Sequence, residues 1–130
     1  MSKGSVLLVD DDKDILELFH MTLLEDGYGV ETADSGMEAL SKVKENKYDV
    51  AVLDVVLPDI QGDKLALEIK RHRDSINIIF ITGYANMVDC INSLPIGVSD
   101  ILLKPITVEA LQQAVKDAIN IKPNINSTQS

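Results

Sequence analysis

The chain has 130 residues and a formal net charge of −9 at pH 7, a length that predicts one domain with a core that needs no disulfide or structural metal. The negative charge argues against direct nucleic-acid binding, which needs a basic surface. The absence of a long apolar run and of a signal-peptide pattern, together with a single cysteine, predicts a cytoplasmic protein without a membrane segment.

Short apolar runs alternate with helical patterns along the whole chain. In chain order, the sequence first predicts a strand at 5–9, a helix over 15–23 that ends at Asp26-Gly27, a short strand at 29–33 and a helix over 39–43 that closes near Asn46. A strand at 48–55, a helix over 65–69 with basic residues in its last turn and a strand at 76–82 follow. The last predicted elements are a short helix over 87–94 that includes Cys90 as a packing residue, a strand at 100–103 and a final helix over 108–119.

This order amounts to five β-α units, and it predicts an α/β fold. Continuous apolar strands between amphipathic helices indicate a parallel five-stranded sheet with helices on both faces. Asp12 or Asp14 is the expected N-cap of the first helix, and Thr107 that of the last. We expect one domain over residues 1–121, followed at 122–130 by a polar tail or the beginning of a linker.

Polar residues stand where four of the predicted strands end. Asp10 and Asp11 follow the first strand, Asp54 ends the third, Thr82 ends the fourth, and Lys104 follows the fifth. The carboxyl ends of parallel strands share one edge of a sheet, where ligands bind in such folds. Three carboxylates there would repel one another, and a hard divalent cation such as Mg²⁺ would relieve the repulsion. A carboxylate can also act as a nucleophile toward phosphorus, and lysine binds phosphate well.

Each of these residues also has an ordinary structural interpretation. An acidic run such as Asp10 to Asp12 commonly caps a helix, Thr82 alone would be an unremarkable strand end, and Lys104 before proline would be a turn. Asp54 resists that interpretation, because it follows an apolar strand and would be partly buried. Their occurrence together at the ends of different strands favours a functional site.

Four segments of the chain resemble receiver domains of two-component response regulators, the phosphoacceptor domains typified by chemotaxis regulators. They are the opening strand and acidic pair at 6–12, the phosphoacceptor segment with its Pro and Gly at 52–62, the threonine with a small residue after it at 79–83, and the lysine motif at 102–106. The resemblance extends from about residue 4 to about residue 121. It implies a flavodoxin-like sheet with strand order 2-1-3-4-5 and a signalling domain with at most self-catalysed phosphorylation and dephosphorylation.

The resemblance also implies a role for each site residue. Asp54 would receive a phosphoryl group from a phosphohistidine on a sensor histidine kinase or a phosphotransfer protein, and Thr82 and Lys104 would bind that group. Mg²⁺ would be bound by Asp11, Asp54 and the backbone carbonyl of Val56, with Asp10 acting mainly through a metal-bound water. The Lys104–Pro105 bond is often cis in relatives. Neither the cognate kinase nor the output partner follows from the sequence.

The chain departs from the family pattern on the surface where relatives bind their outputs. Ile101 replaces the usual Tyr or Phe, and the segment 86–97 is a poor helix former because it contains Asn92 and Pro95. The resemblance further places Val56 and Tyr84 beside the path of the water that hydrolyses the aspartyl phosphate.

Two other functions compete with this one. A haloacid-dehalogenase-like phosphatase would use Asp10 in the Asp10-Asp11-Asp12 run, but Asp54 would then have no role and the chain has no room for a substrate cap. A phosphorylation-independent interaction module with the same fold would not need the complete set of acidic, threonine and lysine residues.

Overall fold

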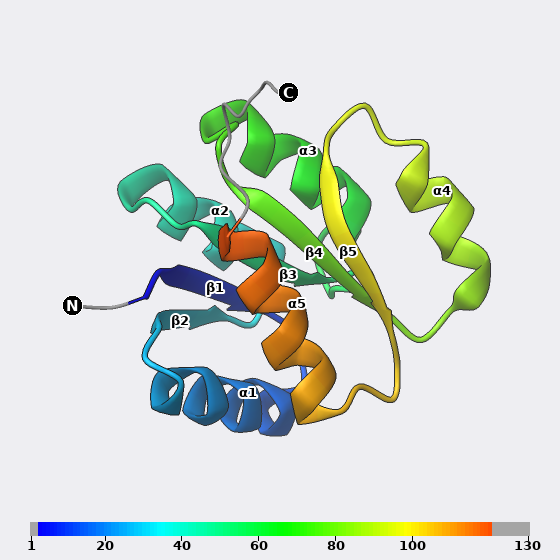
Figure 1. The fold of residues 1–130 in the computed structure, drawn as a ribbon. Coiled ribbons are helices and arrows are strands. Elements are labelled where there is room, and N and C mark those ends of the chain that lie inside the picture. The colour runs from blue at the N-terminus through cyan, green and yellow to red at the C-terminus, as the bar shows by residue number, and fades with distance from the viewer. Residues whose placement is uncertain (1–2, 121–130) are drawn as a thin grey trace, which may run out of the picture.

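The computed structural model describes residues 3–120, in which five strands alternate with helices (Figure 1). The elements are β1 (Ser5–Val9), α1 (Lys13–Glu25), β2 (Gly29–Ala33), α2 (Gly36–Glu45), β3 (Val50–Asp54), α3 (Gly62–His72), β4 (Asn77–Thr82), the 3₁₀ turn η1 (Ala85–Met87), α4 (Val88–Asn92), β5 (Val98–Leu103) and α5 (Val108–Asn120). Within residues 3–120, no helix has the length and apolar composition needed to span a membrane.

The strands form one parallel sheet in the order β2-β1-β3-β4-β5, which confirms the predicted α/β class and flavodoxin-like order. Figure 1 shows α1 and α5 on one face of the sheet, α2 and α3 on the other, and α4 beside the edge strand β5. The three central strands are therefore covered on both faces, which explains why their sequences are continuously apolar rather than alternating.

Alternate residues of the central strands divide the core into two layers. In β1, Leu7 packs with α2 and α3 whereas Leu8 packs with α1 and α5, and in β3 the same division separates Leu53 from Val52. All four side chains are almost completely buried. Because side chains alternate between the faces of a strand, a shift of register by one residue would exchange the two layers, so the packing fixes the register of the sheet.

The helix caps settle one alternative that the sequence leaves open. Asp12 caps α1, because its Oδ1 accepts hydrogen bonds from the N–H groups of Asp14 at 3.0 Å and Ile15 at 3.2 Å. The hydroxyl of Thr107 accepts from the N–H of Ala110 at 3.0 Å, as predicted. The acidic run therefore serves two purposes, since Asp12 belongs to the helix while Asp10 and Asp11 remain at the sheet edge.

The structure differs from the sequence-based expectation mainly around α4. The predicted helix over 87–94 is shortened to the five-residue α4, which follows η1 directly and in which Ile91 alone is buried. Cys90 is exposed, so its prediction as a packing residue was wrong, because so short a helix buries only one side chain against the sheet. The third strand is also shorter than predicted: Tyr48 precedes β3 and is buried beside Glu31, to which its hydroxyl donates a hydrogen bond.

Candidate functional site

The carboxyl ends of β1, β3, β4 and β5 bring the predicted site residues to one edge of the sheet. Asp10 directly follows β1, Asp54 ends β3 and Thr82 ends β4. Thr82 pairs with the last residue of β5, and its carbonyl accepts the backbone N–H of Lys104 at 2.8 Å. Each residue comes from a different strand, and the parallel register places them at a common level.

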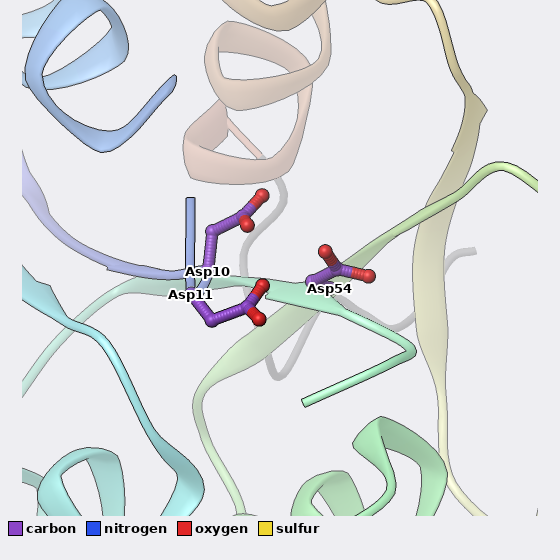
Figure 2. Close-up of side chains that lie close together, drawn as sticks. All are labelled: Asp10, Asp11 and Asp54. Atoms are coloured by element: carbon purple, nitrogen blue, oxygen red, sulfur yellow. The ribbon is translucent and has the colours of Figure 1, made fainter. Parts of the chain in front are cut away.

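Three carboxylates gather at this edge. Asp10, Asp11 and Asp54 each offer a carboxylate oxygen, and these oxygens lie within 4.8 Å of one another. Figure 2 shows Asp10 and Asp11 leaving one segment of the chain and Asp54 approaching from the neighbouring strand. Asp10 and Asp54 are each only 4% exposed, whereas Asp11 is exposed. The cluster is therefore buried on the side of the sheet and open on the side of Asp11.

Asp10 has one satisfied and one unsatisfied oxygen. Its Oδ1 accepts the N–H of Asp12 at 2.9 Å, while its Oδ2 is buried and has no hydrogen-bond partner in the described structure. Burial raises the pKa of Asp10 to about 6, and the neighbouring charge of Asp54 adds to this effect, while the Asp12 N–H and the Lys104 ammonium oppose it. A buried carboxylate oxygen without a partner is costly, which indicates that a further group satisfies it in the functional state.

Asp54 is held through both of its oxygens. Its Oδ1 accepts the backbone N–H of Val56 at 3.0 Å, and its Oδ2 accepts the Lys104 ammonium at 3.0 Å. The same ammonium lies 4.0 Å from Asp10 Oδ2. Burial lowers the pKa of Lys104, but the hydrogen bond to Asp54 and the surrounding carboxylates outweigh burial, so the net shift is upward. Lys104 is therefore a permanent cation at this edge.

Thr82 is 1% exposed and is hydrogen-bonded through its backbone to Lys104. Its Oγ1 accepts the backbone N–H of Tyr84 at 3.0 Å, which orients the hydroxyl. The Lys104–Pro105 peptide bond that follows is cis, as the resemblance implies. The structure thus brings together Asp10, Asp11, Asp54, Thr82 and Lys104, with the backbone of Val56 next to Asp54.

The chemistry of this donor set matches a hard divalent cation. The oxygens come from carboxylates, one of these residues, Asp10, has a buried oxygen without a hydrogen-bond partner, and the exposed side at Asp11 allows bound waters to remain. Mg²⁺ prefers oxygen ligands of this kind and keeps several of its waters. The ammonium of Lys104 lies 3.0 Å from Asp54 Oδ2 and 4.0 Å from Asp10 Oδ2, so it adds a positive charge at the same edge, where it can meet an anionic group.

Sequence reasoning gave no role to Asp59. Its carboxylate accepts the N–H groups of Gly36 and Met37, at the beginning of α2. These contacts join segments more than twenty residues apart in the chain, and no periodic pattern in one sequence reports a pairing of that kind. Gly36, at the first position of the helix, was the one signal of this contact in the sequence. A side chain there would overlap Ile60, so glycine permits the close approach of the loop.

A family model described as the response regulator receiver domain matches residues 6–116. The chain belongs to this family. Among its relatives, the transcriptional regulatory protein GlrR of Escherichia coli (strain K12) is 34% identical over 114 residues, which are 88% of this chain and 26% of GlrR. The response regulator ArlR of Staphylococcus haemolyticus is 29% identical over 119 residues, which are 92% of this chain and 54% of ArlR. The receiver domain therefore spans between about a quarter and about half of these relatives.

Solved structures agree with this assignment. A CheY-like receiver domain protein from Methanospirillum hungatei JF-1 has a TM-score of 0.83 and 31% identity, with 89% of this chain and 93% of that chain covered. The response regulator TrrA from Thermotoga maritima, solved in complex with Mg²⁺-BeF, has a TM-score of 0.79 and 32% identity, with 91% and 99% covered. The chain is thus a receiver domain of a two-component signalling protein rather than a classical enzyme, and the comparisons favour neither the phosphatase nor the phosphorylation-independent module.

Proposed function

We propose that Asp54 of this receiver domain accepts a phosphoryl group in a Mg²⁺-dependent step. One observation carries the proposal: the Asp54 carboxylate is buried, it belongs to a cluster of three carboxylates, and it lies 3.0 Å from the Lys104 ammonium. Carboxylates and an ammonium group, brought to one edge by the ends of β1, β3 and β5, suit the transfer of an anionic group to a carboxylate.

The cation site consists of Asp10, Asp11, Asp54 and the backbone carbonyl of Val56. Asp11 and Asp54 would hold the ion directly, and Asp10 would act mainly through a water molecule; the proximity of the three carboxylates supports this assignment. When bound, Mg²⁺ neutralises the charge that the carboxylates and the phosphoryl oxygens would otherwise bring together. The Mg²⁺-BeF complex of TrrA supports a site of this kind in a similar fold.

The transfer itself requires an exchange of one bond for another. A carboxylate oxygen of Asp54 forms a bond to phosphorus as the phosphorus–nitrogen bond of a phosphohistidine breaks, and the departing imidazole retains the bonding electron pair. The Lys104 ammonium then contacts the phosphoryl oxygens in place of the Asp54 oxygen. The hydroxyl of Thr82 donates to another phosphoryl oxygen while its Oγ1 still accepts from Tyr84.

The donor in this proposal is a sensor histidine kinase or a phosphotransfer protein, which places the domain in the cytoplasm. The domain itself contributes self-catalysed phosphorylation from small phosphodonors and self-catalysed loss of the phosphoryl group. The proposed domain comprises residues 1–121, and the segment 122–130 lies outside the residues that the structure describes. Transcriptional output, as in the name of GlrR, is a property of that relative.

Incubation with acetyl phosphate, followed by intact mass measurement, tests the proposal. We expect the wild-type chain to gain one phosphoryl group with Mg²⁺ and none with a chelator. Asp54→Asn should gain none under either condition, and Lys104→Ala should gain it more slowly. Undiminished uptake by Asp54→Asn would contradict the choice of Asp54, and turnover that depends on Asp10 alone would favour the phosphatase.

A further inference from the structure

The loop between β3 and α3, residues 55–61, carries the Val56 carbonyl of the proposed cation site. Its two ends are joined directly, because the N–H of Gly62 donates to the carbonyl of Val55 at 2.7 Å. A Cβ at Gly62 would overlap the backbone of Asp54 and Val55, so only glycine allows this closure. The ends of the loop are therefore fixed, while its middle needs a separate attachment.

Asp59 supplies that attachment. Its Oδ1 accepts the N–H of Gly36 at 2.8 Å, and its Oδ2 accepts the N–H of Met37 at 2.9 Å. The first N–H groups of a helix have no intrahelical acceptor, and a negative charge at that end is favourable. Hydrogen bonds from Gly36 and Met37 lower the pKa of Asp59, which agrees with a carboxylate that is held in its ionised form.

The loop and α2 are in direct contact at this point. A Cβ at Gly36 would overlap the side chain of Ile60, the residue that follows Asp59. Ile60 in turn packs against the core layer beneath α2 and α3. Glycine at the first position of α2 therefore lets the loop approach closely enough for both oxygens of Asp59 to reach the helix.

Asp59 does more than complete the cap of α2. The helix already has its own cap, because Ser35 Oγ accepts the N–H of Glu38 at 3.2 Å. Glu38 Oε1 also accepts the N–H of Asp34, the residue before this cap, at 2.8 Å. Neither contact reaches the N–H groups of Gly36 and Met37, so Asp59 completes the cap from another segment and thereby connects the loop to the helix.

We infer that Asp59 is a positioning residue for the cation site, an inference that rests on the proposed function. By pinning the middle of the 55–61 loop to α2, Asp59 fixes the backbone of Val56 relative to the carboxylates of the cluster before the cation arrives. Without the pin, cation binding has to order the loop as well, and the entropy of that ordering is subtracted from the affinity.

A Mg²⁺ titration of the full chain, followed by amide chemical shifts, tests this inference. Asp59→Ala should raise the Mg²⁺ dissociation constant roughly tenfold, at the lower end of what loss of an outer partner costs a metal site. Ser35→Ala is the matched control, since it removes a cap from the same turn of α2 without touching the loop. Its Mg²⁺ dissociation constant should equal that of the wild type even if its melting temperature falls.

The rate of phosphorylation by acetyl phosphate gives a second measurement. Asp59→Ala should need about tenfold more Mg²⁺ for its half-maximal rate, in line with the loss of affinity, yet reach the wild-type rate when Mg²⁺ saturates. Asp59→Asn retains one acceptor oxygen, so the Mg²⁺ concentration for its half-maximal rate should lie between those of the wild type and Asp59→Ala. This variant carries the test if the alanine variant does not fold.

Wild-type Mg²⁺ affinity in both Asp59 variants would overturn the inference, as would an equal loss of affinity in Ser35→Ala. The proposed function fails separately: a wild-type chain that binds no Mg²⁺, or an Asp11→Asn variant with unchanged affinity, would remove the cation site and the inference with it.

Discussion

Asp10 is a buried carboxylate whose position costs stability when no cation is present. Burial raises its pKa to about 6, so folding favours the protonated form, and the ionised form that predominates at neutral pH destabilises the folded chain. Asn at position 10 would keep the acceptor for the Asp12 N–H and remove the charge.

We therefore expect Asp10→Asn to raise the melting temperature in chelator by about 3 °C or more. At this chain length, a gain of roughly 1 kcal/mol in the free energy of unfolding gives a shift of that size. The variant should also lose most of the melting-temperature increase that Mg²⁺ gives the wild type, because the proposed cation site has lost one of its three carboxylates. Thermal unfolding of both proteins, with Mg²⁺ and with chelator, makes the comparison. A variant that melts below the wild type in chelator would contradict the electrostatic argument.

Val56 and Tyr84 are the residues expected to set the lifetime of the aspartyl phosphate. Both side chains are exposed, at 54% and 58%, next to residues of the site. Neither offers a carboxylate or an amide that could orient an attacking water, and both are bulky enough to exclude it.

The double variant Val56→Asn with Tyr84→Glu should therefore lose its phosphoryl group faster than the wild type. Mass measurement over time, after removal of the phosphodonor, gives the two half-lives. An equal or longer half-life in the double variant would remove the steric argument.

Among single residues, strand ends were predictable and contacts between distant loops were not. Asp10, Asp54, Thr82 and Lys104 follow apolar runs, so their meeting at one edge follows from a parallel sheet. The pairing of Asp59 with α2 depends on how a loop folds back, and loop paths leave no periodic signal in one sequence.

At the scale of elements, α4 is the least firmly held helix of the described chain. It has five residues, follows a 3₁₀ turn, and contributes only Ile91 to the core. Ile101 of β5 is half-buried and packs against the same core layer as Ile91, where relatives usually have an aromatic ring. Segments with so few buried contacts open easily and respond readily to a bound group.

We expect the segment 84–98 to carry the response to phosphorylation. Hydrogen exchange with and without Mg²⁺ and beryllofluoride should show its largest change in protection there. Changes confined to other segments would contradict this expectation.

The junction between α2 and the 55–61 loop predicts a pH dependence. Hydrogen bonds lower the pKa of Asp59 below its ordinary value of 3.8, so its carboxylate stabilises the fold above that pH. This contribution is lost as the pH falls through the lowered pKa of the folded state. The wild type should therefore melt above Asp59→Asn at neutral pH, and the difference should vanish in strong acid. A difference that stays constant across this range would show that the charge of Asp59 is not involved.

Element boundaries were predicted best where one amphipathic face meets the sheet. The helices α1, α3 and α5 each bury several residues at helical spacing, and the sequence reports that spacing directly. The length of α4 was overestimated, because Pro95 and Gly97 mark where a helix must have stopped but not at which earlier residue it ends.

At the scale of the whole molecule, two apolar layers hold the site. The layer under α1 and α5 and the layer under α2 and α3 both pack on β1 and β3, the strands that bear Asp10 and Asp54. Fully packed strands fix the positions of the residues at their ends, so the site is organised before any ligand binds. Strand order was available from the family resemblance, because parallel strands of similar composition do not reveal their neighbours.

Asp54 carries the phosphoryl group in the proposed function, and its acyl phosphate can be trapped chemically. An aspartyl phosphate is reduced by borohydride to homoserine, so peptide mapping after treatment with acetyl phosphate, Mg²⁺ and borohydride identifies the acceptor residue directly. Homoserine at position 54 and at no other aspartate is the result that the geometry predicts. Homoserine at position 10 or 11, or its absence from a chain that has taken up phosphate, would contradict it.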